Sequence, residues 1–171
     1  TVTANGSLTA KNLNLSAGTL SGSGNLTVTN AFSQTSGTIN TTGDLSITQA
    51  AGALNIANTI NAAAITLAAS AGSINVQDAT VSASGAMTVN ANGVSVIANT
   101  ASALLSSVGA QSITVGSGGL TLTGAGGSAA SKSAQITQTG AAATQSITVK
   151  TGGTYTVTVT GMTSRMPSRP T

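Results

Sequence analysis

The chain has no cysteine and no histidine, and these two absences exclude several kinds of chemistry. Without cysteine there is no disulfide framework and no thiolate ligand for a metal. Without histidine a Ser-His-Asp triad cannot form, and the commonest general base is missing. The sequence therefore predicts a protein that is not an enzyme and that has no catalytic residues, no cofactor and no metal site.

Charged residues are scarce, at 4% of the chain against about 25% in ordinary globular domains. The two acids, Asp44 and Asp78, stand at different offsets from their neighbouring strands, which does not favour the paired carboxylates of a glycosidase. We interpret both as turn residues whose carboxylates cap local backbone amides. The five Lys and Arg residues are scattered and lack stacking aromatics, so nucleic acid is excluded as a partner.

Aromatic residues are almost absent, with one Phe, one Tyr and no Trp, although 40% of the chain is hydrophobic. Small and β-branched side chains suit a narrow core between closely spaced strands. The sequence also has no apolar run of about 18 residues and no recognisable signal peptide. We therefore expect no membrane insertion, and we expect a mature chain or a fragment of a longer one.

Short triplets of the form apolar, polar, apolar recur along the chain, which is the strongest signal in the sequence. The starts of one set lie 19, 20, 22 and 26 residues apart: Leu26–Val28, Leu45–Ile47, Ile65–Leu67, Met87–Val89 and Ile113–Val115. The starts of a second set lie 20, 20 and 26 residues apart: Leu54–Ile56, Ile74–Val76, Val94–Val96 and Leu120–Leu122. A third, less regular column runs through Leu20, Ile39, Ile60 and Val81.

Each triplet alternates with a period of two, as a half-buried strand does. Such short strands bury their apolar faces when successive repeats stack in register and hydrogen-bond to one another. Crossovers between parallel strands are strongly preferred in the right-handed sense. The predicted fold class is therefore all-β, a right-handed parallel β-helix, or β-solenoid, with coils of about 20 residues.

The regular pattern predicts one β-helical domain over residues 1–160, with two irregular stretches. An insertion is expected near residues 97–112, where Ala98 to Gly109 suggests a short helix or a bulging loop. Gly-rich turns are expected over 116–127. Residues 161–171 hold both prolines and two arginines and are interpreted as a tail or linker.

Hydroxyl side chains occupy the middle positions of the first triplet set and are expected to point outward. They would stack into a ladder of Thr27, Ser46, Thr66, Thr88 and Thr114. Threonine is a good exposed strand residue, and this alone accounts for the ladder. Carbohydrate contact and ice binding remain open as alternatives.

The triplets from Leu26 to Val89, joined at about 20 residues by Gly-, Asn- and Ser-rich turns, resemble filamentous haemagglutinin-type repeats. The resemblance covers roughly residues 6–122. It implies a bacterial adhesin β-helix exported by two-partner secretion, or an autotransporter passenger. The Asn-Pro-rich motifs of the secretion domain have no match, and no binding residues carry over.

Three hypotheses about function follow. The first is a stiff structural or adhesive spacer in a large bacterial fibre, located outside the cell or on its surface. The second is a self-assembling filament subunit, since no amphipathic capping helix is evident at either end. The third is a glycan- or ice-binding module. The expected partners are the chain itself, end to end or as the continuation of a longer chain, and host or matrix glycans.

Overall fold

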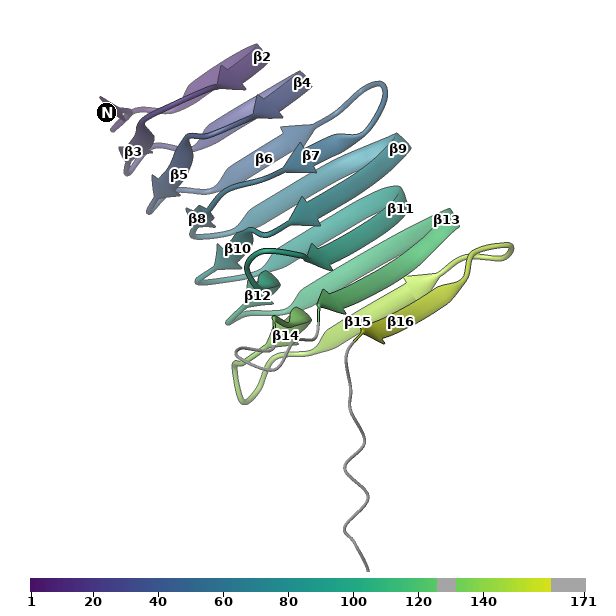
Figure 1. Cartoon of the computed structure of the whole chain (residues 1–171). Coiled ribbons are helices and arrows are strands. Elements are labelled where there is room, and N and C mark those ends of the chain that lie inside the picture. Colours follow the sequence, from purple (N-terminus) through teal and green to yellow (C-terminus); the bar gives the residue numbers. More distant parts are fainter. Residues whose placement is uncertain (126–131, 161–171) are drawn as a thin grey trace, which may run out of the picture.

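The computed structural model describes residues 1–125 and 132–160, which form strands joined by turns, with no helix among them (Figure 1). These strands belong to two sheets in which neighbouring strands run parallel, and each coil contributes to both sheets. The predicted all-β class and the β-solenoid architecture are therefore confirmed. The right-handed sense of the coil stays a prediction.

The first sheet takes one short strand from each coil. In spatial order these strands are β1 (Val2–Thr3), β3 (Thr19–Gly22), β5 (Thr38–Thr41), β8 (Ile60–Ala62), β10 (Thr80–Ala83), β12 (Ala103–Ser107) and β14 (Ala134–Gln138). Leu20, Ile39, Ile60 and Val81 pair in succession across this sheet. The third column predicted from the sequence is thus confirmed.

The second sheet holds the longer strands. Its main path is β15 (Gln145–Val149), β13 (Gln111–Ala125), β11 (Met87–Ala98), β9 (Ile65–Gln77), β6 (Leu45–Thr48), β4 (Leu26–Gln34) and β2 (Leu8–Leu15). Two further strands lie beside this path: β7 (Leu54–Ile56) pairs with β9, and β16 (Tyr155–Thr160) pairs with β13. Figure 1 shows the chain bending sharply within β9, β11 and β13, so each coil is a flattened loop.

The triplet sets predicted from the sequence align as expected through the middle of the chain. The starts of the first set, Leu26, Leu45, Ile65 and Met87, pair in succession. We call the full row of paired residues the first column: Leu8, Leu26, Leu45, Ile65, Met87, Gln111 and Gln145. The starts of the second set, from Leu54 to Leu120, also pair in succession.

The register predicted for the last triplet of the first set is wrong by two residues. Met87 pairs with Gln111, 24 residues on, while Ile113 pairs with Val89. The register shifts near Ala91 and Gly93, where the opposing strand carries extra residues between Val115 and Gly119. The extra length of this coil is therefore split between the bend in β13 and the turn that precedes β12.

The expectation of a short helix or bulging loop over Ala98 to Gly109 is wrong for its central part. Residues Ala103–Ser107 form β12, which pairs with β10 on one side and β14 on the other. The expected broad turns after Gly116 are replaced as far as Ala125 by β13, in which Gly119 has a φ of 75°. Gly126 and Gly127 lie outside the described residues.

One continuous cluster of aliphatic side chains fills the solenoid from coil to coil. Ile39, Ile47, Leu67 and Val76 are all 0% exposed, and each fully buried side chain of this size stabilises the fold by about 1.5–3 kcal/mol. Phe32 is also buried and is the chain's one phenylalanine. The prediction of a narrow core of small and branched residues is consistent with this packing.

Turns of successive coils touch backbone to backbone. A Cβ added at Gly72 would overlap the carbonyl of Gly52 in the preceding coil, so a larger residue would force the two coils apart. The predicted domain end at residue 160 stays a prediction, because residues 161–171, expected to be a tail or linker, lie outside the described part of the chain.

Candidate functional surfaces

A row of hydroxyl side chains crosses the outer face of the second sheet. Its paired members, which we call the hydroxyl column, are Thr9, Thr27, Ser46, Thr66, Thr88, Ser112 and Ser146. Thr66 and Thr88 are exposed, as are both serines of the last coils, Ser112 and Ser146. The outward ladder predicted from the sequence exists, but Thr114 belongs to the neighbouring row, paired with Asn90 and Thr148.

The hydroxyl column is free of internal hydrogen bonds. Within residues 1–125 and 132–160, no side-chain hydrogen bond involves Thr66, Thr88 or Ser112, in contrast to Thr19 and Thr38, whose hydroxyl oxygens lie 3.2 Å apart on the first sheet. The column also carries no charge. These hydroxyls are therefore open to water or to a ligand.

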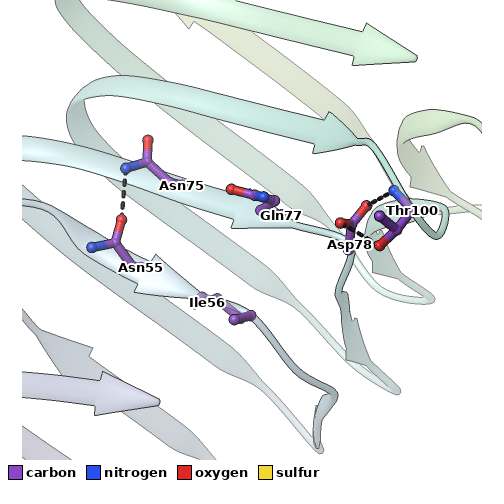
Figure 2. A pocket seen from close by; sticks show the side chains of 7 residues that line it. Asn55, Ile56, Asn75, Gln77, Asp78 and Thr100 are labelled. Carbon is purple, nitrogen blue, oxygen red and sulfur yellow. Dashed lines mark hydrogen bonds between the residues drawn. The ribbon is translucent and has the colours of Figure 1, made fainter. Parts of the chain in front are cut away.

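Asp78 organises the turn of the coil that follows it (Figure 2). Its Oδ1 accepts hydrogen bonds from the amides of Asn99, Thr100 and Ala101 at 2.6, 2.9 and 3.1 Å, and its Oδ2 accepts one from the Thr100 hydroxyl at 2.8 Å. Its φ of 52° lies in the left-handed region, which Asp tolerates better than most residues. The side chain thus ties one coil to the next.

The pKa of Asp78 is lowered by this turn. Desolvation raises the pKa, but it is outweighed by hydrogen bonds from the Ala101 amide, the Thr100 hydroxyl and the amides of Asn99 and Thr100. All four hydrogen bonds favour the charged carboxylate. The carboxylate is thus occupied by the turn and has little capacity left for another ligand.

Asp44 plays a similar part at another corner. Its amide donates to Oδ1 of Asn25 in the preceding coil at 2.9 Å, and its own Oδ1 accepts from the Ala64 amide of the following coil at 3.1 Å. Both acids cap backbone amides, as the sequence predicts, but the expectation that these amides are local is wrong. The capped amides belong to the adjoining coil, about 20 residues away, because stacking brings equivalent corners together.

A shallow depression of about 410 Å³ lies beside Asp78, lined by Asn55, Asn75, Gln77 and Thr100 (Figure 2). The Asn75 Nδ2 donates to Asn55 Oδ1 at 2.7 Å, and the same amide stacking joins Asn30 to Asn12. In Figure 2 these side chains lie along the strands and do not converge on one point. Asp78 is the one carboxylate in its lining, and the hydroxyl that contacts this carboxylate, that of Thr100, belongs to the turn that Asp78 caps.

Polar side chains also point into the solenoid, and the sequence reasoning missed them. Thr41 donates to the Gly22 and Gly24 carbonyls at 3.0 and 3.1 Å, and Ser107 donates to the Gly109 carbonyl at 3.0 Å. Their inward position follows from strand alternation once the neighbouring core residue is known. They donate to carbonyls at the corners of the coil, and the Gly22 carbonyl also accepts from the Thr42 amide at 3.0 Å.

Gln111 is the least expected inward residue. It is 1% exposed and occupies the first column, where the preceding coils carry leucine, isoleucine or methionine. Its Nε2 donates to the Thr137 carbonyl at 3.2 Å, and its Oε1 accepts from Nε2 of Gln145 at 2.6 Å. The sequence contains no clear sign of this inward position. The triplet pattern aligned Ile113 with Met87 and so concealed the two-residue difference that places Gln111 in the first column.

The two ends of the solenoid expose core positions. At the N-terminal end Val2 and Leu8 are 63% and 36% exposed, beside a hollow of about 250 Å³ that Leu13 and Leu20 also line. At the other end Ile147 and Tyr155 are 40% and 60% exposed. These side chains hold the positions that neighbouring coils cover elsewhere in the fold.

Within residues 1–125 and 132–160, side chains of His, Cys, Asp and Glu form no group of three or more that could hold a metal ion. No helix in the same residues is long and apolar enough to cross a membrane.

No protein-family model matches the chain, and no match was found among curated proteins or solved structures. The likeness to filamentous haemagglutinin-type repeats therefore rests on the triplets and on the β-solenoid fold alone.

Proposed function

We propose that this chain is a stiff spacer segment of a large bacterial adhesin fibre, outside the cell or on its surface. The support for stiffness is the continuous core, in which every coil from Leu26 to Leu120 shares buried side chains with its neighbours. Parallel strands add hydrogen bonds between the same coils. Bending such a rod would break both kinds of contact at once.

The observation that carries the proposal is the state of the two ends. Val2, Leu8, Ile147 and Tyr155 occupy column positions and are all at least 36% exposed. Unpaired strand edges accompany them at β2 and β15, the outermost strands of the second sheet. Further coils of the same kind would pair with these strand edges and cover these apolar side chains. A segment within a longer solenoid has such neighbours at both ends.

Two observations support the proposed extracellular location: the resemblance to filamentous haemagglutinin-type repeats, and the absence of cysteine, which is compatible with export of an unfolded chain through an oxidising compartment. Host or matrix glycans are the proposed partners of the complete fibre. The segment itself makes contact with further coils at its ends and acts by holding a binding region at a distance.

Chains lengthened by copies of an internal coil test the spacer. One or two copies of residues 65–86, inserted between Ala86 and Met87, should give rods of constant cross-section whose length grows by about 4.8 Å for each added coil. Small-angle scattering and electron microscopy measure both dimensions. A length that does not grow with the added coils would contradict the proposal, and fibres of indefinite length from the unmodified chain would favour the self-assembling filament subunit.

A glycan- or ice-binding module is the second candidate, favoured by the uncharged hydroxyl column and its lack of internal hydrogen bonds. Thr66→Lys and Thr88→Lys would place charge on this face, while Ser82→Lys provides a control on the other sheet. A glycan array and a thermal-hysteresis measurement decide the matter. Signal that is lost in the first two variants and kept in the control supports a binding face; no signal from the unmodified chain rejects it.

A further inference from the structure

The two ends of the solenoid differ in chemistry. At the N-terminal end the first column closes with Leu8, and Val2, Leu13 and Leu15 surround it. At the opposite end the first column closes with Gln145, stacked on the buried Gln111. One end therefore presents an aliphatic surface, and the other presents an amide at the same position of the coil.

The amides of Gln111 and Gln145 form a hydrogen-bonded stack. Gln145 Nε2 donates to Gln111 Oε1 at 2.6 Å, and Gln111 Nε2 in turn donates to the Thr137 carbonyl at 3.2 Å and contacts Met87 Sδ at 3.6 Å. The Oε1 of Gln145 has no hydrogen-bond partner among the described residues. Gln145 is exposed, so water can serve this oxygen at the open end.

Covering this end with another coil would remove that water. A buried amide oxygen left without a donor is costly, whereas one that meets a donor is not. Within the chain, Gln111 receives its donor from the amide of the next coil at the same column position. An amide side chain at the same position of a further coil would donate to Oε1 of Gln145 in the same way.

We propose that the C-terminal end of this solenoid is a docking site for a β-solenoid coil that carries an amide side chain, glutamine or asparagine, directly over Gln145. The inference rests on the proposed function, in which further coils stack on both ends. The coil that stacks on the N-terminal end carries an aliphatic side chain over Leu8. The chain's own ends are therefore mismatched, since end-to-end stacking would place Leu8 on Gln145.

Added coils test this assignment in the full chain. A copy of residues 58–77 is inserted after Thr160, once unchanged and once with Ile65→Gln in the copy, so that isoleucine or glutamine lies over Gln145. A copy of residues 57–79 is placed before Thr1 in the same two versions. Melting temperatures are then compared with those of the unmodified chain by circular dichroism.

The glutamine version should melt about 2–4 °C higher than the isoleucine version at the C-terminal end, and about 2–4 °C lower at the N-terminal end. Equal melting, or a preference for isoleucine at both ends, would overturn the amide assignment while leaving the spacer intact. No stabilisation by any added coil would instead reject stacking at the ends, and with it the spacer.

Self-association provides a second readout that does not depend on an inserted coil. Leu8→Gln should increase end-to-end association in sedimentation velocity, because it places an amide opposite Gln145. The exposed control Ser7→Gln should leave association unchanged. If the unmodified chain associates end to end as strongly as the Leu8→Gln variant, the mismatch between its ends does not exist.

Discussion

The middle coils, residues 26–98, and the C-terminal coils, residues 99–125 and 132–160, share one hydrogen-bonded ladder but differ in what fills it. In the middle coils the first column holds Leu45, Ile65 and Met87, each 1% exposed. In the C-terminal coils it holds Gln111 and Gln145, which are 34 residues apart in the chain. The parallel pairing of strands thus continues across long connections and over polar inward side chains. The regular spacing of about 20 residues between apolar triplets is therefore not required for the fold.

The largest expected effect is the loss of folding stability when a buried side chain of the middle coils is shortened, compared with an exposed one of the C-terminal coils. Ile65→Ala should cost about 2–5 kcal/mol, because it leaves a cavity in the filled middle of the core. Ile147→Ala should cost less than about 1 kcal/mol, since this side chain is already 40% exposed. Urea denaturation followed by circular dichroism gives both values. Similar losses would mean that the C-terminal end is covered in solution.

The close approach of backbones between the middle coils predicts a smaller loss of folding stability when a glycine at such a contact is replaced. Gly72→Ala should cost about 1–3 kcal/mol, because the new methyl group meets the Gly52 carbonyl and the coils must move apart. Gly6→Ala is the matched control, with nothing within 4 Å of its added Cβ. The same denaturation measurement applies. A neutral Gly72→Ala variant would show that the middle coils can separate freely.

The polar interior of the C-terminal coils predicts a smaller effect. Gln111→Leu keeps the side-chain volume but removes the hydrogen bonds to Gln145 and to the Thr137 carbonyl, at a cost of about 0.5–1.5 kcal/mol. Amide hydrogen exchange in β15 should accelerate, and exchange in β9 should not. Gln135→Leu, on the exposed side of β14, is the control. Unchanged exchange in β15 would count against a stabilising amide stack.

The same comparison explains how far the sequence could predict the fold. Triplets such as Ile65–Leu67 and Ile74–Val76 identified the columns because every inward residue was a large aliphatic. The strand Ala103–Ser107 was missed because it turns Ala103, Leu105 and Ser107 inward, and only one of these is a large apolar residue. Gln111 concealed the true register for the same reason.

The surfaces were predicted less completely than the core. Asp44 and Asp78 were recognised as amide caps from their residue type and position beside strands. Their partners in the adjoining coil were not, because a single sequence does not say which turns meet until the register is known. The open ends were predicted from the missing capping helices, but their difference in chemistry depends on Gln145, whose inward position required the structure.

Asp78 lies where the two regions meet. The pH dependence of stability that we expect from its carboxylate is the smallest of the effects considered. Its pKa is lowered in the folded state by the amides of Asn99 to Ala101 and the Thr100 hydroxyl, despite the opposing effect of desolvation. A lowered pKa adds stability above the unfolded value of about 3.9, and this stability is lost as the pH falls through the folded pKa. The urea midpoint should therefore decline as the pH is lowered below about 5.

Asp78→Asn separates this contribution from general acid sensitivity. Asparagine retains an oxygen for the three amides and tolerates a φ of 52°, so the variant should fold, with a slightly lower urea midpoint at neutral pH. As the pH falls and Asp78 becomes protonated, the difference between the two midpoints should shrink, because the charge that distinguishes the two side chains is lost. Thr100→Val, which removes only the hydroxyl donor, should reduce the pH dependence in part. If Asp78→Asn has the same pH dependence as the unmodified chain, this carboxylate does not stabilise the junction between the two regions.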